Sequence, residues 1–253
     1  MVIIKSPREI ALMKEAGKVV GLVFKKLEQE IHPGMTTLDI DAIVEKTMLE
    51  NDCTPSEKGY YGYPASACVS VNETLLHGIP SNKIVIHEGD IVSVDIVANY
   101  HGYHADACRT FKVGTITERA SRLVDTTKAS FFEAVKLIKP GVYLGDICHR
   151  IQEFIESSGY NVVREFTGHG IGSHMHEDPN IPNYGKPGTG PVLKEGMTIA
   201  VEPMLNLGTP KIYILDDDWT IVTRDGLPSA HYEHTVVVTK DGYRILTGDD
   251  NFE

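Results

Sequence analysis

The chain repeats part of its own sequence at a shift of 107 positions, and this repeat limits the folds that are open to it. Residues 88–95 (EGDIVSVD) are matched by residues 195–202 (EGMTIAVE), and the same shift places Pro33-Gly34 on Pro140-Gly141. Such a period is far longer than that of a solenoid repeat, so we interpret it as a duplicated half-domain. Each half then contributes one carboxylate-bearing strand to a shared centre.

Helix signals recur in the same order in the two halves. The first helix is expected to begin at Ser6-Pro7, where Glu9 can complete a capping box, and to end before Pro33-Gly34. A second helix is expected from about Thr37, and a third over about residues 118–138. A fourth follows with isoleucines at positions 147, 151 and 155. Each half therefore begins with a helix, a Pro-Gly break and another helix.

Strand signals follow the helices of each half. The expected strands are residues 91–97, 103–113, 198–204 and 231–238. The first two form a hairpin around a turn at residues 99–102, and about 20 inserted residues separate the last two. We therefore expect an α+β fold in which residues 1–253 form a single domain, with halves at about 1–115 and 116–253.

Composition excludes several classes of protein. The formal net charge of −11 and the absence of a dense Lys/Arg run argue against direct reading of nucleic acid. The four cysteines form no CxxC pair, and in a chain of 253 residues they indicate reduced thiols rather than a disulfide framework. The first residues are too short for a signal segment, and no run of about 18 apolar residues predicts a membrane span. We expect a cytoplasmic monomer.

Acidic residues interrupt the apolar strands of both halves and indicate a metal site. One acidic strand residue alone is usually solvent-facing, but Asp95 and Glu202 stand at equivalent positions of the repeat. Asp106 and Glu233 lie in the strands that follow them. Four converging carboxylates without cations would repel one another and take up protons. With His169 from a glycine-flanked loop, this ligand set favours two divalent ions, of Mn, Fe(II), Co or Zn.

Other histidines are candidates on weaker grounds. His77 and His176 alone are ordinary loop histidines, and His174 shares a face with His176 if the loop is extended, so the choice between them stays open. His104 and His231 each precede a proposed ligand by two residues, and we expect supporting roles for both. The segment 167–172 (TGHGIG) is not a dinucleotide fingerprint, because the third glycine is missing and no helical pattern follows.

The quoted residues resemble the motifs of type I methionine aminopeptidases over essentially the whole chain. The resemblance is carried by residues 60–68 (YYGYPASAC), 77–80 (HGIP), 168–172 (GHGIG) and 232–235 (YEHT), together with Asp95, Asp106 and Glu202. It implies the pita-bread fold, with antiparallel sheet flanked by helices in two pseudo-twofold halves. It also implies removal of the N-terminal methionine from nascent polypeptides with a small second residue, with transient contact to the ribosome.

The resemblance also implies a role for each matched residue. Asp95 would be the bidentate ligand of one metal ion, Asp106 and Glu233 would bridge two ions, and His169 and Glu202 would complete the second site. A metal-activated hydroxide would attack the carbonyl carbon, and Glu202 would help to move a proton to the leaving amine.

The remaining implied roles concern the substrate. His77 and His176 would hydrogen-bond the substrate amide and the developing oxyanion. The methionine side chain would bind among Tyr60, Tyr63, Cys68, Met175 and Trp219. Aromatic and sulfur-containing neighbours suit a thioether, although such residues also pack ordinary cores.

Two other functions remain open from the sequence. A different pita-bread metallopeptidase, of the prolidase or aminopeptidase P type, would prefer an X-Pro peptide. A non-catalytic pita-bread binding module would have lost metal ligands, and all five are present here.

Overall fold

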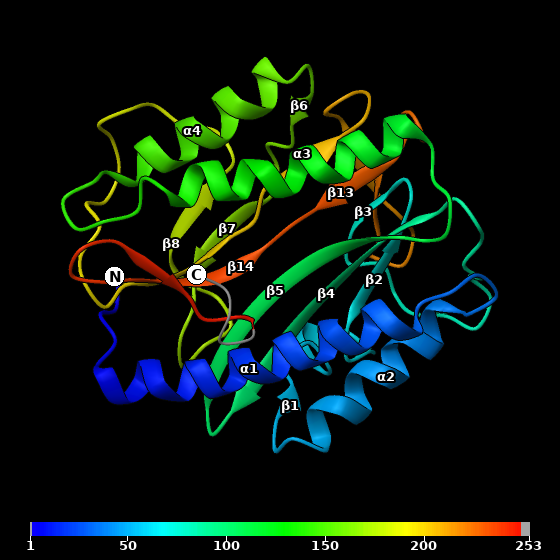
Figure 1. Cartoon of the computed structure of the whole chain (residues 1–253), viewed down its shortest axis with the longest axis horizontal. Coiled ribbons are helices and arrows are strands. Elements are labelled where there is room, and N and C mark those ends of the chain that lie inside the picture. Colours follow the sequence, from blue (N-terminus) through cyan, green and yellow to red (C-terminus); the bar gives the residue numbers. More distant parts are fainter. Residues whose placement is uncertain (1, 249–253) are drawn as a thin grey trace.

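Two pairs of helices enclose the strands of the molecule, as Figure 1 shows. The computed structural model describes residues 2–248. One pair is α1 (Pro7–Glu30) and α2 (Thr37–Leu49), and the other is α3 (Glu118–Val135) and α4 (Leu144–Ser157). Each pair comes from one half of the repeat, so the expected duplication of the helices is confirmed.

The helix starts agree with the capping signals in the sequence. The side chain of Ser6 accepts a hydrogen bond from the Glu9 amide while the Glu9 carboxylate accepts one from the Ser6 amide, which is the expected capping box. Thr36 caps α2 in the same way with Asp39. Only the end of α3 differs, because this helix stops at Val135 and residues 136–139 turn toward a proline that cannot continue it.

The first-half sheet is built around a long antiparallel hairpin. Strand β4 (Ile91–Tyr100) pairs with β5 (Tyr103–Lys112), and β1 (Thr54–Pro55) and β2 (Cys68–Val71) pair with the other edge of β4. The turn is shorter than expected. It contains only His101 and Gly102, both with positive φ, which matches the twist of the flanking strands. A short 3-10 helix, η1 (Tyr60–Gly62), precedes β2.

The second-half sheet has the order β15-β14-β9-β7-β8, with all described pairings antiparallel. Two smaller sheets have the orders β13-β10-β6 and β11-β12-β3. The bounds of these strands are β3 (Thr74–Leu76), β6 (Asn161–Val162), β7 (Thr167–Gly170), β8 (Glu177–Pro182), β9 (Thr198–Val201), β10 (Met204–Asn206), β11 (Ile212–Ile214), β12 (Ile221–Thr223), β13 (Ser229–His231), β14 (His234–Val238) and β15 (Tyr243–Ile245).

Two strands expected to be continuous are each broken at an acidic residue. The expected strand 198–204 is divided into β9 and β10 at Glu202-Pro203, because proline lacks the amide that a ladder requires. The expected strand 231–238 is divided into β13 and β14 at Tyr232-Glu233. In the first half, by contrast, Asp95 and Asp106 lie inside unbroken strands.

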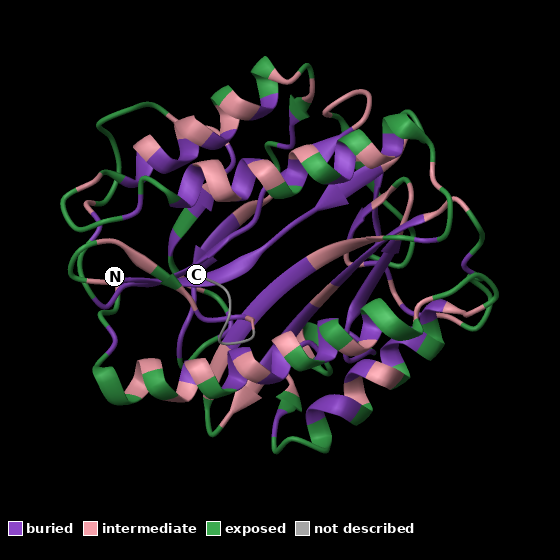
Figure 2. Cartoon of the chain, in the orientation of Figure 1, coloured by how far each residue is buried: buried purple, intermediate pink, exposed green. Residues whose placement is uncertain are grey.

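Backbone hydrogen bonds join the two halves at the centre of the molecule. The amide of Glu233 donates to the carbonyl of Cys108 on β5, and the Cys108 amide donates back to the Glu233 carbonyl. The amide of Asp106 also donates to Oγ1 of Thr235 on β14. Figure 2 shows that most of the strand surface between the helix pairs is buried. None of the described helices is both long enough and apolar enough to cross a membrane.

Candidate active site

The four acidic residues predicted as ligands converge where β5 meets the breaks of the second half. Asp95 on β4 is paired with Cys108 on β5, and paired residues face the same side of a sheet. Asp106 lies two residues from Cys108 on β5, so its carboxylate is on the same face of the hairpin as that of Asp95. Glu202 and Glu233 approach this face from the strand breaks. Asp106, Glu202 and Glu233 are at most 8% exposed. The two halves of the repeat therefore supply two carboxylates each.

His169 lies in strand β7 rather than in the expected loop, and the flanking glycines allow this strand to pack closely against its neighbours. Its Nε2 lies 3.5 Å from Oδ2 of Asp106 and 3.6 Å from Oε1 of Glu202. A Cβ at Gly168 would overlap the carbonyl oxygen of Ala200, and a Cβ at Gly170 would overlap that of Asp178. The glycines that flank His169 are therefore required by backbone contact with the neighbouring strands.

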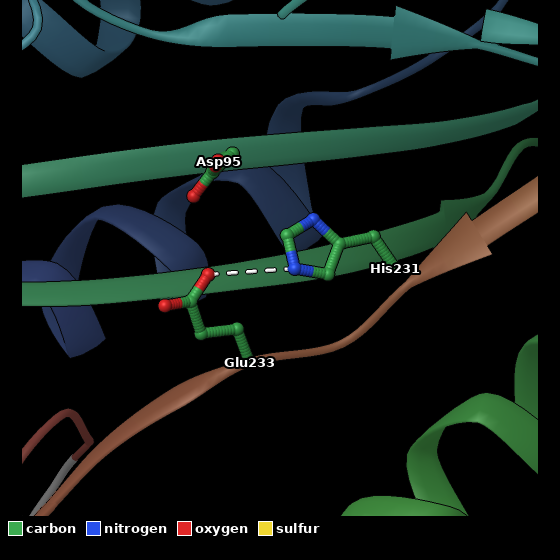
Figure 3. Close-up of side chains that lie close together, drawn as sticks. All are labelled: Asp95, His231 and Glu233. Atoms are coloured by element: carbon green, nitrogen blue, oxygen red, sulfur yellow. Dashed lines mark ion pairs between the residues drawn. The ribbon is translucent and has the colours of Figure 1, made fainter. Parts of the chain in front are cut away.

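His231 is a candidate ligand that the sequence reasoning treated only as a supporting residue. Its Nε2 lies 3.4 Å from Oε2 of Glu233 and 4.0 Å from Oε2 of Glu202. Figure 3 shows Asp95, His231 and Glu233 converging on one point. Their ligand atoms lie within 4.8 Å of one another, as do those of Asp106, His169 and Glu233. The sequence predicted only a supporting role for His231 because residues 231–238 were expected to form one strand. In the structure His231 ends β13, and Glu233 lies in the break that follows.

The chemistry of the cluster fits divalent cations. Oδ1 of Asp95, Oδ1 of Asp106 and Oε1 of Glu233 are buried without a hydrogen-bond partner. Burial raises the pKa of Asp106 to about 7, and burial together with the neighbouring carboxyls raises the pKa of Glu202 and Glu233 well above the usual range. Burial lowers the pKa of His169 to about 4. Neutral imidazole beside crowded carboxylates is a typical set of metal ligands.

The carboxyl cluster is expected to make the metal-free protein less stable as the pH rises from about 4 to about 7. The buried Asp106 carboxyl, with its pKa raised to about 7, keeps a proton that the unfolded chain releases near pH 4, so its stabilising contribution is complete below about pH 4 and is lost as the pH rises to about 7. Buried histidines act in the opposite direction, because burial lowers the pKa of His169 to about 4 from the value of about 6.5 in an unfolded chain. Bound divalent metal would remove only the carboxyl contribution, so calorimetry should show the melting temperature of the chelated protein falling relative to that of the metal-loaded protein between about pH 5 and about pH 7. A difference between the two melting temperatures that stays constant over this range would contradict the prediction.

A cavity of about 230 Å³ opens beside the cluster. It is lined by all five residues predicted for the methionine side chain, which are Tyr60, Tyr63, Cys68, Met175 and Trp219. The rings of Tyr63 and Trp219 meet edge to face with centroids 5.0 Å apart. Leu76 and Phe166 also line the cavity and were missed, because isolated apolar residues beside short strands carry no signal of their own.

Glu57 is a further acidic residue of the cavity that the sequence reasoning missed. Its Oε1 accepts a hydrogen bond from the Val97 amide, at the position on β4 between β1 and β2. Its side chain is buried, and burial together with Asp95 and Asp106 raises its pKa well above the usual range. It stands in a loop, where nothing in the local pattern distinguishes it from a solvent-facing glutamate.

Of the loop histidines, His77 and His176 line the cavity and His174 does not. His77 has a φ of 54°, an uncommon conformation for a residue with a side chain, which is often found at functional sites. Nδ1 of His176 lies 2.8 Å from the Tyr60 hydroxyl, and its ring centroid lies 4.4 Å from that of His169. His104 instead contacts the backbone carbonyl of Gly172 through Nδ1. Of His174 and His176, it is therefore His176 that lies where it can contact a molecule in the cavity.

Sequence comparison identifies close relatives over nearly the full chain. The model of metallopeptidase family M24 matches residues 11–240. A methionine aminopeptidase of Clostridium acetobutylicum is 51% identical over 98% of this chain and 99% of its own. Methionine aminopeptidase 1 of Bacillus subtilis is 46% identical with the same coverage.

Solved structures agree with this relationship. The methionine aminopeptidase of Thermotoga maritima superimposes with a TM-score of 0.97 at 47% identity, over 98% of this chain and all of that one. A prolidase from Pyrococcus furiosus has a TM-score of 0.78 at 27% identity, and this chain covers 66% of it. The expected pita-bread fold is therefore confirmed.

Proposed function

The chain belongs to metallopeptidase family M24, among its methionine aminopeptidases of the bacterial type, and we propose that it removes N-terminal methionine from polypeptides whose second residue is small. It is a metal-dependent hydrolase that cleaves the peptide bond after the methionine. The observation that carries the proposal is the shared cavity, in which carboxylate oxygens without a hydrogen-bond partner lie beside an aromatic and sulfur-containing pocket.

We propose that Asp95, Asp106, His169, Glu202 and Glu233 would hold the metal, and that Asp106 and Glu233 would be shared if two ions bind. Both candidate groups of ligand atoms contain Glu233, which supports a bridging position for this residue. The position of Asp106 beside Asp95 on the hairpin and beside His169 supports its bridging role. Two divalent ions, of Co, Mn, Fe(II) or Zn, would make water nucleophilic near neutral pH and polarise the scissile carbonyl.

His77 and His176 supply hydrogen bonds to the substrate in this assignment. Burial lowers the pKa of each to about 4, so both rings are neutral at pH 7. A Tyr60 hydroxyl that donates to Nδ1 of His176 leaves the proton of that ring on Nε2, where it can be donated to the oxyanion. Glu202 lies beside both His169 and His231 and can transfer a proton to the leaving amine.

The substrate pocket fits an unbranched side chain with a soft sulfur atom. Tyr63 and Trp219 form an aromatic wall, and Cys68 and Met175 place further sulfur atoms around it. Each apolar contact that a wrong side chain loses in such a pocket costs about 1–3 kcal/mol of discrimination. We therefore expect methionine to be preferred over leucine by contact and shape.

The test is a metal add-back assay. The protein is stripped with chelator, supplied anaerobically with Mn, Fe(II), Co or Zn, and assayed on Met-Ala-Ser, Leu-Ala-Ser and Ala-Pro-Ser peptides. We expect metal-dependent cleavage of the methionine peptide alone. Cleavage of Ala-Pro-Ser would assign the chain to the prolidase side of the fold. No cleavage with any metal would favour a binding module.

The cellular setting follows from the substrate. Nascent polypeptides carry the N-terminal methionine that the enzyme removes, so we propose that it acts in the cytoplasm, with transient contact to the ribosome. We also propose that residues 1–253 act as one catalytic domain and as a monomer. Sedimentation of the purified protein with and without ribosomes tests both the contact and the monomer.

A further inference from the structure

A buried ion pair ties the segment before α1 to the loop that carries His176. Nζ of Lys5 lies 2.5 Å from Oε2 of Glu177, and the two side chains are only 2% and 3% exposed. Lys5 also donates through its backbone amide to the carbonyl of Gly196, just before β9. The lysine is therefore held both through its backbone amide and through its side-chain ammonium. Its side-chain partner, Glu177, lies 172 positions later in the sequence.

Glu177, the partner of Lys5, also forms a hydrogen bond to the loop between β7 and β8. Oε1 of Glu177 accepts a hydrogen bond from the amide of His174, so one carboxylate closes the loop and binds the lysine at once. Met175 and His176 lie between these two anchored positions and both line the cavity. The opposite side of the loop is fixed by the carbonyl of Gly172, which accepts from the His104 amide.

The close fit of Lys5 also explains the last glycine of the GHGIG segment. A Cβ at Gly172 would overlap Cε of Lys5 and would stand 2.7 Å from Oε1 of Glu177. A side chain at position 172 would therefore displace the side chains of Lys5 and Glu177 from the positions they hold in the ion pair. Gly168 and Gly170 allow close contact with the neighbouring strands, whereas Gly172 leaves space for the side chain of Lys5.

We propose that Lys5 is a positioning residue for catalysis, which acts through Glu177 to hold Met175 and His176 toward the cavity. The inference rests on the proposed function, because it assigns those two residues to the substrate. A charge buried without its partner is strongly unfavourable, so the loop cannot move away from Lys5 without leaving two buried charges unpaired. The segment before α1 thereby restrains a loop of the active site.

The test separates positioning from simple stabilisation. Lys5→Met removes one charge, whereas Lys5→Met with Glu177→Leu removes both and leaves an apolar pair, which often restores stability. We expect both variants to lose at least about tenfold in kcat with unchanged metal content, because Glu177 loses its lysine partner in the single variant and the His174 amide loses its acceptor in the double variant. Lys136→Met, which breaks a surface pair between Glu133 of α3 and the residue that follows this helix, is the matched control.

A second readout does not depend on turnover. Trp219 is the chain's single tryptophan and lines the cavity, so its fluorescence reports the binding of L-methionine. We expect weaker binding in the metal-loaded double variant even where its melting temperature matches the unaltered protein. A double variant that regains both stability and kcat would overturn the proposal, as would normal kcat or lost metal in Lys5→Met. Failure of the unaltered protein to cleave any methionine peptide would instead overturn the proposed function.

Discussion

Replacing Asp106 by Ala is expected to abolish both turnover and stoichiometric metal binding. Asp106 is 5% exposed, its Oδ1 has no hydrogen-bond partner, and its Oδ2 lies 3.5 Å from Nε2 of His169. If it bridges two ions, its loss removes one ligand from each. Removing an outer-shell partner of a metal ligand already costs about 10–100-fold in affinity or activity, and a shared ligand should cost more. Metal analysis after gel filtration and the rate with Met-Ala-Ser measure the two effects.

The isosteric variant Asp106→Asn separates charge from shape. It keeps the packing of β5 but removes the negative charge that balances the cations, so we expect it to fold and still to lose metal. Asp125→Ala on α3 is the control, because its carboxylate pairs with Lys112 at the surface. Retained metal at the stoichiometry of the unaltered protein in either Asp106 variant would contradict the bridging role.

The helices and the carboxylate strands could be predicted because their causes are local. Capping residues set the start of α1 and α2, and the repeat made one helix pair imply the other. Acidic residues in apolar strands are costly to bury without cations, so Asp95 and Asp106 already indicated a metal site. The hairpin register then placed both on one face, as alternation requires.

The missed residues depend on contacts that no local pattern contains. Glu57 meets β4 through the gap between β1 and β2, and Lys5 meets Glu177 across most of the chain. His231 reaches the cluster because β13 ends there, at a point where one continuous strand was expected. The break lets the Glu233 backbone pair with Cys108 of the other half, which is a long-range event. Sequence periodicity describes elements, and these contacts lie between elements.

Replacing His77 by Ala is expected to lower kcat by about 10²–10³-fold while metal content stays unchanged. His77 lines the cavity but belongs to neither candidate group of metal ligands, and its ring centroid lies 6.0 Å from that of Phe166 and 6.1 Å from that of Trp219. A donor aimed at charge that develops on the reacting amide in the transition state contributes about this much to the rate. Its loss should therefore leave metal binding intact and should affect kcat more than KM.

The backbone at His77 dictates the control for this prediction. Its φ of 54° is disfavoured for alanine but tolerated by asparagine, so His77→Asn separates lost hydrogen bonding from lost backbone geometry. If the imidazole donates to the substrate, His77→Asn should fold like the unaltered protein and recover only part of the rate. Full activity in His77→Ala would remove this residue from the mechanism. Lost metal would place it at the metal centre, where the structure has no ligand atom of His77 within either group.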